Sequence, residues 1–239
     1  MDDSNPFAAP QRLSAPLRPL LGLTVLVVED SRYACDAMRL LCLRSGARIR
    51  RADCLASARR HLQIYRPSII IVDVGLPDGS GLDLIGELAG TAPRIGVILG
   101  ISGDDCAQDA AIAAGADGFL RKPLISLAAF QAEILSHLPA ERRPPGPRGV
   151  ADELIRPDPL AYIDDMEHVA DVLSDQSQDR VLDYVAQFVG GIARSADDTV
   201  MADAAEQLAR SRSQGGPVGA ATARIAGLVQ ERLQHKQAI

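Results

Sequence analysis

Polar side chains that could do chemistry follow short apolar runs in the first half of the chain. Ile69–Val72 runs directly into Asp73, and other apolar runs end near Glu29 and Asp30, Ser102, and Lys122. Short apolar runs bounded by turn residues are typical of strands buried in a parallel sheet. The carboxyl ends of parallel strands lie at one edge of the sheet, where open α/β folds place their sites. We therefore expect these side chains to meet.

Three carboxylates at neighbouring strand ends would repel one another unless a cation lies between them. Mg²⁺ suits such a place, because it binds a few carboxylates and keeps several waters. The sequence predicts that Asp30 and Asp73 hold Mg²⁺ together with a backbone carbonyl, that of Gly75. Glu29 is expected to act indirectly, through water or through the groups around the metal.

The same edge supplies donors for a phosphoryl group. The ammonium of Lys122 and the hydroxyl of Ser102 suit phosphoryl oxygens, so Asp73 is predicted to be a nucleophile that becomes an aspartyl-phosphate. Taken singly, each residue has a plainer interpretation: Asp73 a turn cap, Glu29 a helix-start acid, Ser102 a helix cap and Lys122 a solvated lysine. Their joint placement in strand order favours the phosphoryl site.

The elements that would position these groups alternate between strand and helix five times. Right-handed crossovers then give an α/β fold, a five-stranded parallel sheet with helices on both faces. The strands are expected at residues 23–28, 48–52, 69–73, 95–101 and 118–120.

Changes in composition divide the chain into four predicted parts. Residues 1–21 are rich in Pro and are predicted to be a flexible tail, and residues 22–138 hold the alternating elements. Residues 139–159, rich in Pro and Arg, are predicted to be an extended, solvated linker. Residues 160–239 carry apolar stripes at helical spacing and are predicted to form a small helical bundle or hairpin.

Composition also narrows the class of protein. The 239 residues carry a net charge of −6 and no Trp, which argues against stacking surfaces for single-stranded nucleic acid. The four cysteines lack C-x-x-C spacing, so reduced thiols are expected and a zinc site is not. An apolar run long enough to cross a bilayer and a signal peptide are both missing. A cytoplasmic protein is expected.

These motifs resemble the receiver domain of two-component response regulators over about residues 22–138. The likeness rests on Glu29-Asp30, Asp73 with Leu76-Pro77 and Gly81-Leu82, Ser102, and Phe119 before Lys122-Pro123. It implies a flavodoxin-like fold, Mg²⁺-dependent phosphorylation of Asp73 by a histidine kinase or phosphotransfer protein, a bacterial source and a cis peptide before Pro123. In the family's switch, carried over here, phosphate draws Ser102 inward and the ring of Phe119 follows. Gly75 departs from the family, where a larger side chain often shields the phosphate.

The second half is predicted to act through protein contact or dimerisation, under the control of phosphorylation. From Val150 onward, 15 acidic residues stand against 8 Lys and Arg, so this part would be repelled by DNA. One alternative is a histidine-phosphotransfer-like bundle, possibly degenerate, or a catalytic module. His168 is then the candidate histidine, although a plain surface His is the simpler interpretation. Another alternative is a scaffold that is seldom phosphorylated.

Overall fold

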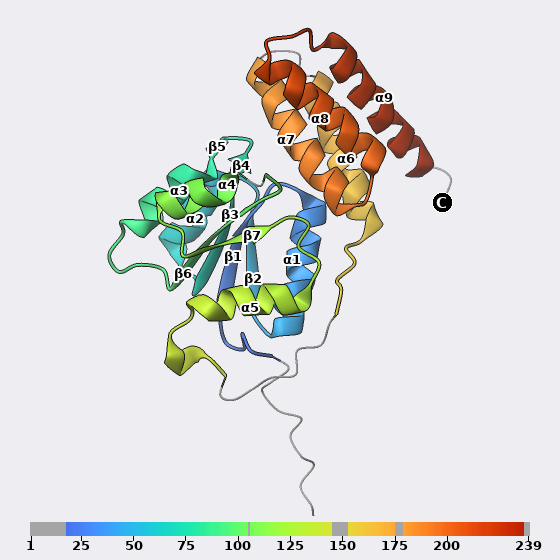
Figure 1. Cartoon of the computed structure of the whole chain (residues 1–239). Helices are drawn as coiled ribbons and strands as arrows, with labels where there is room; N and C mark the ends of the chain where they lie inside the picture. The colour runs from blue at the N-terminus through green and yellow to red at the C-terminus, as the bar shows by residue number, and fades with distance from the viewer. Residues whose placement is uncertain (1–17, 105, 145–152, 175–178, 237–239) are drawn as a thin grey trace, which may run out of the picture.

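The computed structural model describes residues 18–104, 106–144, 153–174 and 179–236. Its main feature is a five-stranded sheet in the order β2-β1-β3-β6-β7, with every neighbouring pair parallel (Figure 1). The strands are β1 (Thr24–Val28), β2 (Arg48–Ala52), β3 (Ile69–Asp73), β6 (Val97–Ser102) and β7 (Gly118–Arg121). The interior strands β3 and β6 are buried along their whole length, as their continuous apolar runs predicted.

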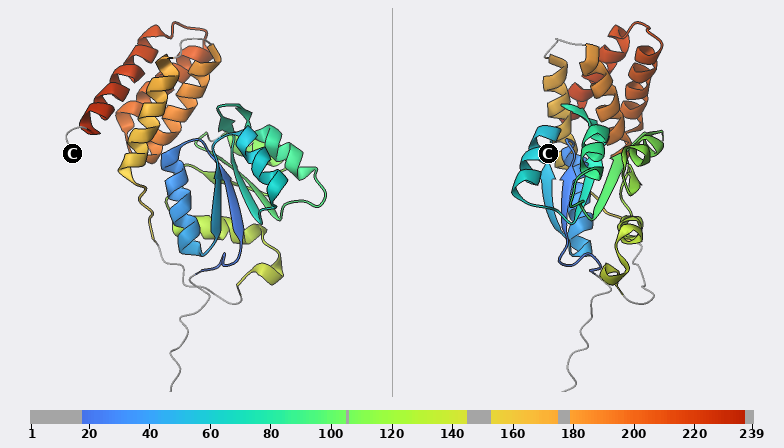
Figure 2. Two further views of the ribbon diagram at one scale, coloured as in Figure 1. Left: turned by 180° about the vertical axis from the view of Figure 1, so that it is seen from behind. Right: turned by 90° about the vertical axis from the view of Figure 1, so that its left-hand side faces the viewer.

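Helices cover both faces of this sheet. On one face, α1 (Arg32–Ser45) and α5 (Leu127–His137) pack against alternate residues of β1 and β3. On the other face, α2 (Leu55–Ile64), α3 (Gly81–Ala89) and α4 (Ala107–Ala114) pack against the residues between them. The layers are visible edge-on in the right-hand view of Figure 2. This is the predicted flavodoxin-like α/β fold.

Local sequence signals set the ends of α1. Ser31 caps the start, because its side chain accepts a hydrogen bond from the backbone N–H of Ala34 at 3.0 Å. Gly46 ends the helix in the left-handed conformation at φ 83°, which glycine adopts without a steric penalty. α1 therefore begins directly after Glu29 and Asp30 in the chain.

A small hairpin that the sequence did not predict follows β3. It pairs β4 (Gly75–Leu76) with β5 (Gly79–Ser80) in antiparallel fashion. Gly81 comes next and passes so close to the carbonyl oxygen of Asp73 that a Cβ atom there would overlap it. The absence of a side chain at residue 81 therefore lets this loop fold back over the end of β3.

Four helices at the end of the chain form a separate bundle, as predicted. They are α6 (Pro159–Ser174), α7 (Asp179–Ser195), α8 (Thr199–Ser213) and α9 (Gly219–Lys236). Their apolar stripes meet in one core, which includes Met166, Val189, Leu208 and Ile225. This group of four helices, here called the bundle, lies at the carboxyl end of the strands, near α1 (Figures 1 and 2).

The structure differs from the predicted boundaries at two places. Leu20, expected in the tail, is completely buried in the core under α1. Ile155, expected in a solvated linker, is 5% exposed in the same core, and its N–H donates to the carbonyl of Ile125 at 2.7 Å. Large apolar side chains explain both differences, since a Pro-rich context does not prevent their burial. The rest of the predicted tail (1–17) and residues 145–152 of the predicted linker lie outside the described residues.

Two further expectations concern composition. All four cysteines are free thiols, and Cys35 and Cys42 are buried. Among the described residues, no helix combines the length and apolar character needed to cross a bilayer.

Candidate functional site

Strand register brings the predicted residues together at the carboxyl edge of the sheet. Val28 pairs with Val72, so Glu29 and Asp73 lie one residue further on, side by side. Asp73 pairs with Ile101 of β6, and Ser102 follows directly. The N–H of Lys122 then donates to the carbonyl of Ser102 at 2.9 Å. The parallel register alone is therefore enough to gather these groups.

Lys122 joins two of the carboxylates. Its Nζ lies 2.5 Å from Oδ2 of Asp73 and 2.6 Å from Oε2 of Glu29. The other carboxylate oxygen of Asp73, Oδ1, accepts from the N–H of Gly75 at 3.1 Å. Asp73 is 6% exposed and Glu29 is fully buried. The Asp73 carboxylate is therefore held in one orientation by a cation on one side and a backbone donor on the other.

Burial and charge act in opposite directions on these groups. Burial is the main reason that the pKa of Glu29 is well above its usual value, and the charges of Asp73 and Asp30 raise it further against the effect of Lys122. Burial lowers the pKa of Lys122, but the carboxylates of Asp73 and Glu29 raise it overall. Lys122 is therefore charged at neutral pH.

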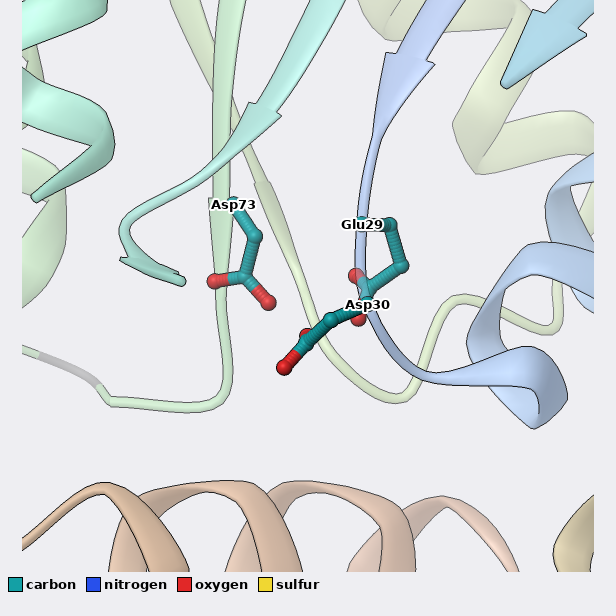
Figure 3. Close-up of side chains that lie close together, drawn as sticks. All are labelled: Glu29, Asp30 and Asp73. Atoms are coloured by element: carbon teal, nitrogen blue, oxygen red, sulfur yellow. The ribbon is translucent and has the colours of Figure 1, made fainter. Parts of the chain in front are cut away.

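Asp30 completes an acidic cluster with Glu29 and Asp73, in which one ligand atom from each lies within 4.8 Å of the others. Figure 3 shows the side chains of Asp30 and Asp73 directed toward the same space. Burial, opposed by a hydrogen bond from Tyr184 and supported by the charge of Asp73, raises the pKa of Asp30 to about 6.

The residues fit a divalent cation. The buried Oδ1 of Asp30 has no hydrogen-bond partner among the described residues, although a buried carboxylate oxygen normally has one. Three clustered carboxylates against one lysine leave an excess of negative charge. Oxygen donors of this kind suit Mg²⁺.

The two predicted switch residues occupy different surroundings. Ser102 is 2% exposed, lines the cavity beside Asp73 and Lys122, and accepts from the N–H of Asp104 at 3.1 Å. Phe119 is partly buried on the face of the sheet that α2, α3 and α4 cover, where its ring lies beside Gly100, two strand positions before Ser102. The structure therefore places Ser102 at the carboxylates and Phe119 away from them. The predicted cis peptide between Lys122 and Pro123 is present.

Comparison with known proteins agrees with the resemblance found in the sequence motifs. The family described as the response regulator receiver domain matches residues 25–134. These residues form a receiver domain. The transcriptional regulatory protein KdpE of Mycobacterium tuberculosis is 37% identical over 101 residues, which are 41% of this chain and 44% of that protein. KdpE of Escherichia coli is 32% identical over 99 residues, and the virulence regulator PhoP of Salmonella typhimurium is 31% identical over 103.

The chain spans less than half the length of these relatives, between 44% and 46%. Among solved structures, a response regulator of Chloroflexus aurantiacus has 25% identity and a TM-score of 0.46, covering 48% of this chain and 96% of that one. Chemotaxis response regulator CheY4 of Vibrio cholerae has 21% identity and a TM-score of 0.44, with coverage of 48% and 98%.

The bundle adds side chains to the receiver's carboxyl edge that sequence reasoning missed. Asp165 of α6 accepts hydrogen bonds at the start of α1, and Tyr184 of α7 donates to Oδ2 of Asp30 at 2.6 Å. Gln187 of α7 lies against Gly75, in the space that a side chain at residue 75 would fill. One signal pointed to Asp165: it stands in the apolar stripe of Tyr162, Met166 and Val169, where an acid is unexpected.

His168, the candidate histidine of the alternative prediction, lies on α6 near the same edge. Its side chain is exposed, and its Nε2 lies 3.0 Å from the hydroxyl of Tyr184, which in turn donates to Asp30. The structure therefore brings His168 into a hydrogen-bonded chain with the receiver's acidic cluster.

Proposed function

We propose that this protein is a two-component response regulator that is phosphorylated on Asp73. The observation that carries the proposal is the convergence of Lys122 and a backbone N–H on the two oxygens of the Asp73 carboxylate, beside two further acids. Asp30 and Asp73, with the backbone carbonyl of Gly75, would hold Mg²⁺, and Glu29 would contribute indirectly. The donor would be a histidine kinase or a phosphotransfer protein in the cytoplasm.

In this proposal Asp73 is the nucleophile and the chain is a phosphoacceptor that promotes its own modification. A carboxylate oxygen of Asp73 forms a bond to phosphorus while the bond from phosphorus to the donor's nitrogen breaks, and that electron pair stays with the donor. Lys122 and the hydroxyl of Ser102 would bind the phosphoryl oxygens. Bound Mg²⁺ supplies further positive charge to those oxygens. Ser102 and Phe119 would carry the conformational signal.

We propose the division into tail (1–21), receiver (22–138), linker (139–159) and helical output (160–239), with Leu20 and Ile155 packed on the receiver. The output would act through protein contact, including contact with a second copy. The acid-rich composition from Val150 onward supports this choice over DNA binding. The relatives are named transcriptional regulators, so DNA binding is the competing function. Fluorescence anisotropy with a mixed-sequence duplex, with and without a beryllofluoride phosphate mimic, separates the two.

The phosphoacceptor is tested by incubating the protein with Mg²⁺ and acetyl phosphate and following its mass. We expect one phosphate adduct on the wild type, none on Asp73→Asn, and a wild-type adduct on Asp109→Asn, which changes an exposed acid on α4. An adduct that persists in Asp73→Asn contradicts the assignment. A wild type that gains no phosphate from any phosphodonor also contradicts the assignment.

A second candidate function is phosphotransfer through the bundle. The hydrogen-bonded chain from His168 through Tyr184 to Asp30 favours it, because it connects a histidine with the receiver's acidic cluster. His168→Gln is the test, since Gln keeps a polar side chain but removes the phosphorylatable nitrogen. If His168→Gln and the wild type show the same phosphoryl transfer from a histidine kinase, phosphotransfer through the bundle is rejected.

A further inference from the structure

The start of α1 is held by a residue of the bundle more than a hundred positions away. Asp165 accepts from Ser31 Oγ at 2.7 Å, from the N–H of Arg32 at 2.7 Å and from the N–H of Tyr33 at 3.1 Å. The first N–H groups of a helix lack partners within the helix and favour an anion. Asp165 is 2% exposed, so this carboxylate is buried between bundle and receiver. It is an anchor and not a solvated surface group.

A second set of contacts runs along α7, across the carboxyl edge itself. Tyr184 donates to Asp30, one of the proposed metal ligands. Gln187 lies against Gly75, and Arg194 lies near the carbonyl of Gly103, with 3.4 Å from nitrogen to oxygen. Helices with the bundle's orange colour pass directly opposite the three acids in Figure 3. We call Asp165, Tyr184, Gln187 and Arg194 the cap face.

The space between the cap face and Asp73 is small. The cavity is lined on the receiver side by Asp73, Ser102 and Lys122, and on the α7 side by Gln187 and Gly191, among others. It leaves about 20 Å³ for the centres of water molecules, which is room for about one water. A phosphoryl group with its three oxygens, a metal ion and the metal's waters needs more. The docked bundle therefore leaves no room in this cavity for a phosphoryl group on Asp73.

We propose that the cap face is a docking surface for the receiver's carboxyl edge, and that it competes there with the phosphodonor protein. This inference rests on the proposed function. In the resting protein the bundle covers Asp73. A donor reaches Asp73 only when α6 and α7 move away, and the phosphoryl group with its metal then prevents them from returning. Phosphorylation thereby exposes the cap face to other proteins.

The test uses the full chain and a variant that weakens docking without touching the nucleophile. Tyr184→Phe removes the bond to Asp30 and keeps the ring that stacks on Phe188. Hydrogen exchange at the N–H groups of Arg32 and Tyr33 reports docking, because both groups donate to Asp165 and neither takes part in the bond from Tyr184 to Asp30 that the variant removes. We expect both exchange and phosphorylation by acetyl phosphate to be at least about tenfold faster than in the wild type, the effect of losing one hydrogen bond to a charged group.

Two further versions make the outcome decisive. Asp165→Ala, which removes the anchor, should accelerate phosphorylation at least as much as Tyr184→Phe. Asp203→Ala, a change of an exposed acid on α8, should behave as wild type. Addition of Mg²⁺ and beryllofluoride to the wild type should raise exchange at Arg32 and Tyr33 to the rate in the variants.

Equal phosphorylation rates in the wild type and in all variants would overturn the proposed competition between the bundle and the phosphodonor, while leaving the proposed function standing. Exchange that is insensitive to beryllofluoride would also overturn it. Absence of any adduct, in the variants as well as the wild type, would overturn the proposed function itself, and the competition with it. Circular dichroism of each variant shows that the comparison is between folded proteins.

Discussion

Replacing Asp30 by Asn should stabilise the metal-free protein at pH 8, although it removes a proposed metal ligand. Burial, the opposing bond from Tyr184 and the charge of Asp73 together raise the pKa of Asp30 from 3.8 to about 6. A shift of about 2 units is worth about 3 kcal/mol at 1.36 kcal/mol per unit. Asn has the same size, carries no charge and can still accept the hydrogen bond from Tyr184.

The sign follows from the direction of the shift. The folded-state pKa lies above the unfolded value, so the protonated form is favoured by folding. Asp30 therefore contributes its full stability only below about pH 4, and this contribution is lost as pH rises through about 6. At pH 8 the wild type should be less stable than Asp30→Asn by about 2–3 kcal/mol, and at pH 4 the difference should nearly vanish.

The assay is urea unfolding followed by far-ultraviolet circular dichroism, because the chain has no Trp for fluorescence. It is run with EDTA at both pH values and again with Mg²⁺. A cation that binds only the folded protein adds stability. Mg²⁺ should therefore raise the free energy of unfolding of the wild type and leave that of Asp30→Asn nearly unchanged. Asp109→Asn is the control. The reasoning is refuted if Asp30→Asn is no more stable than the wild type in EDTA at pH 8, or if Mg²⁺ stabilises both alike.

Three further predictions concern the fold around the site. Gly81→Ala should cost about 2 kcal/mol or more in urea unfolding and slow phosphorylation, because its Cβ would overlap a backbone carbonyl. Iodoacetamide at pH 8 should label exposed Cys106 and spare Cys42, whose pKa burial raises to about 12; peptide mass spectrometry checks this. Burial raises the pKa of Asp198, but hydrogen bonds, foremost from Arg232, outweigh burial and lower this pKa overall. The stabilising effect of the Asp198 carboxylate is therefore lost as pH falls below about 4. Asp198→Asn should flatten this acid dependence and cost about 1–2 kcal/mol at pH 7, measured by thermal unfolding.

The sheet and the five residues at its carboxyl edge could be predicted because local sequence encodes both. Ile69–Asp73 is apolar enough to be a strand in any α/β context, and parallel pairing then fixes where Asp73 lies. Gly46 marked a helix end for the same local reason. The hairpin after β3 was missed because its strands have only two residues each. Such short strands show no periodicity.

The docking of the bundle could not be predicted from spacing. Asp165 and Ser31 are separated by 134 positions, and Tyr184 and Asp30 by 154, so no local pattern connects them. A polar residue on an amphipathic helix normally faces water, and Tyr184 and Gln187 fit that pattern. Two local anomalies carried information: an acid within the apolar stripe of α6, and the missing side chain at Gly75. Both proved to be contact points between bundle and receiver.

The burial of Ile155 sets the length of a tether. Ile155 is fixed in the receiver core, and α6 begins at Pro159. Four residues of extended chain reach at most about 14 Å. When the bundle leaves the carboxyl edge, the first residue of α6 therefore stays within about 14 Å of Ile155, and the bundle remains at an effective concentration in the millimolar range or above. Any partner protein must compete with the tethered bundle, which cannot diffuse away. The chemistry at Asp73 therefore sets how long the bundle stays released, and the distance that the bundle travels does not.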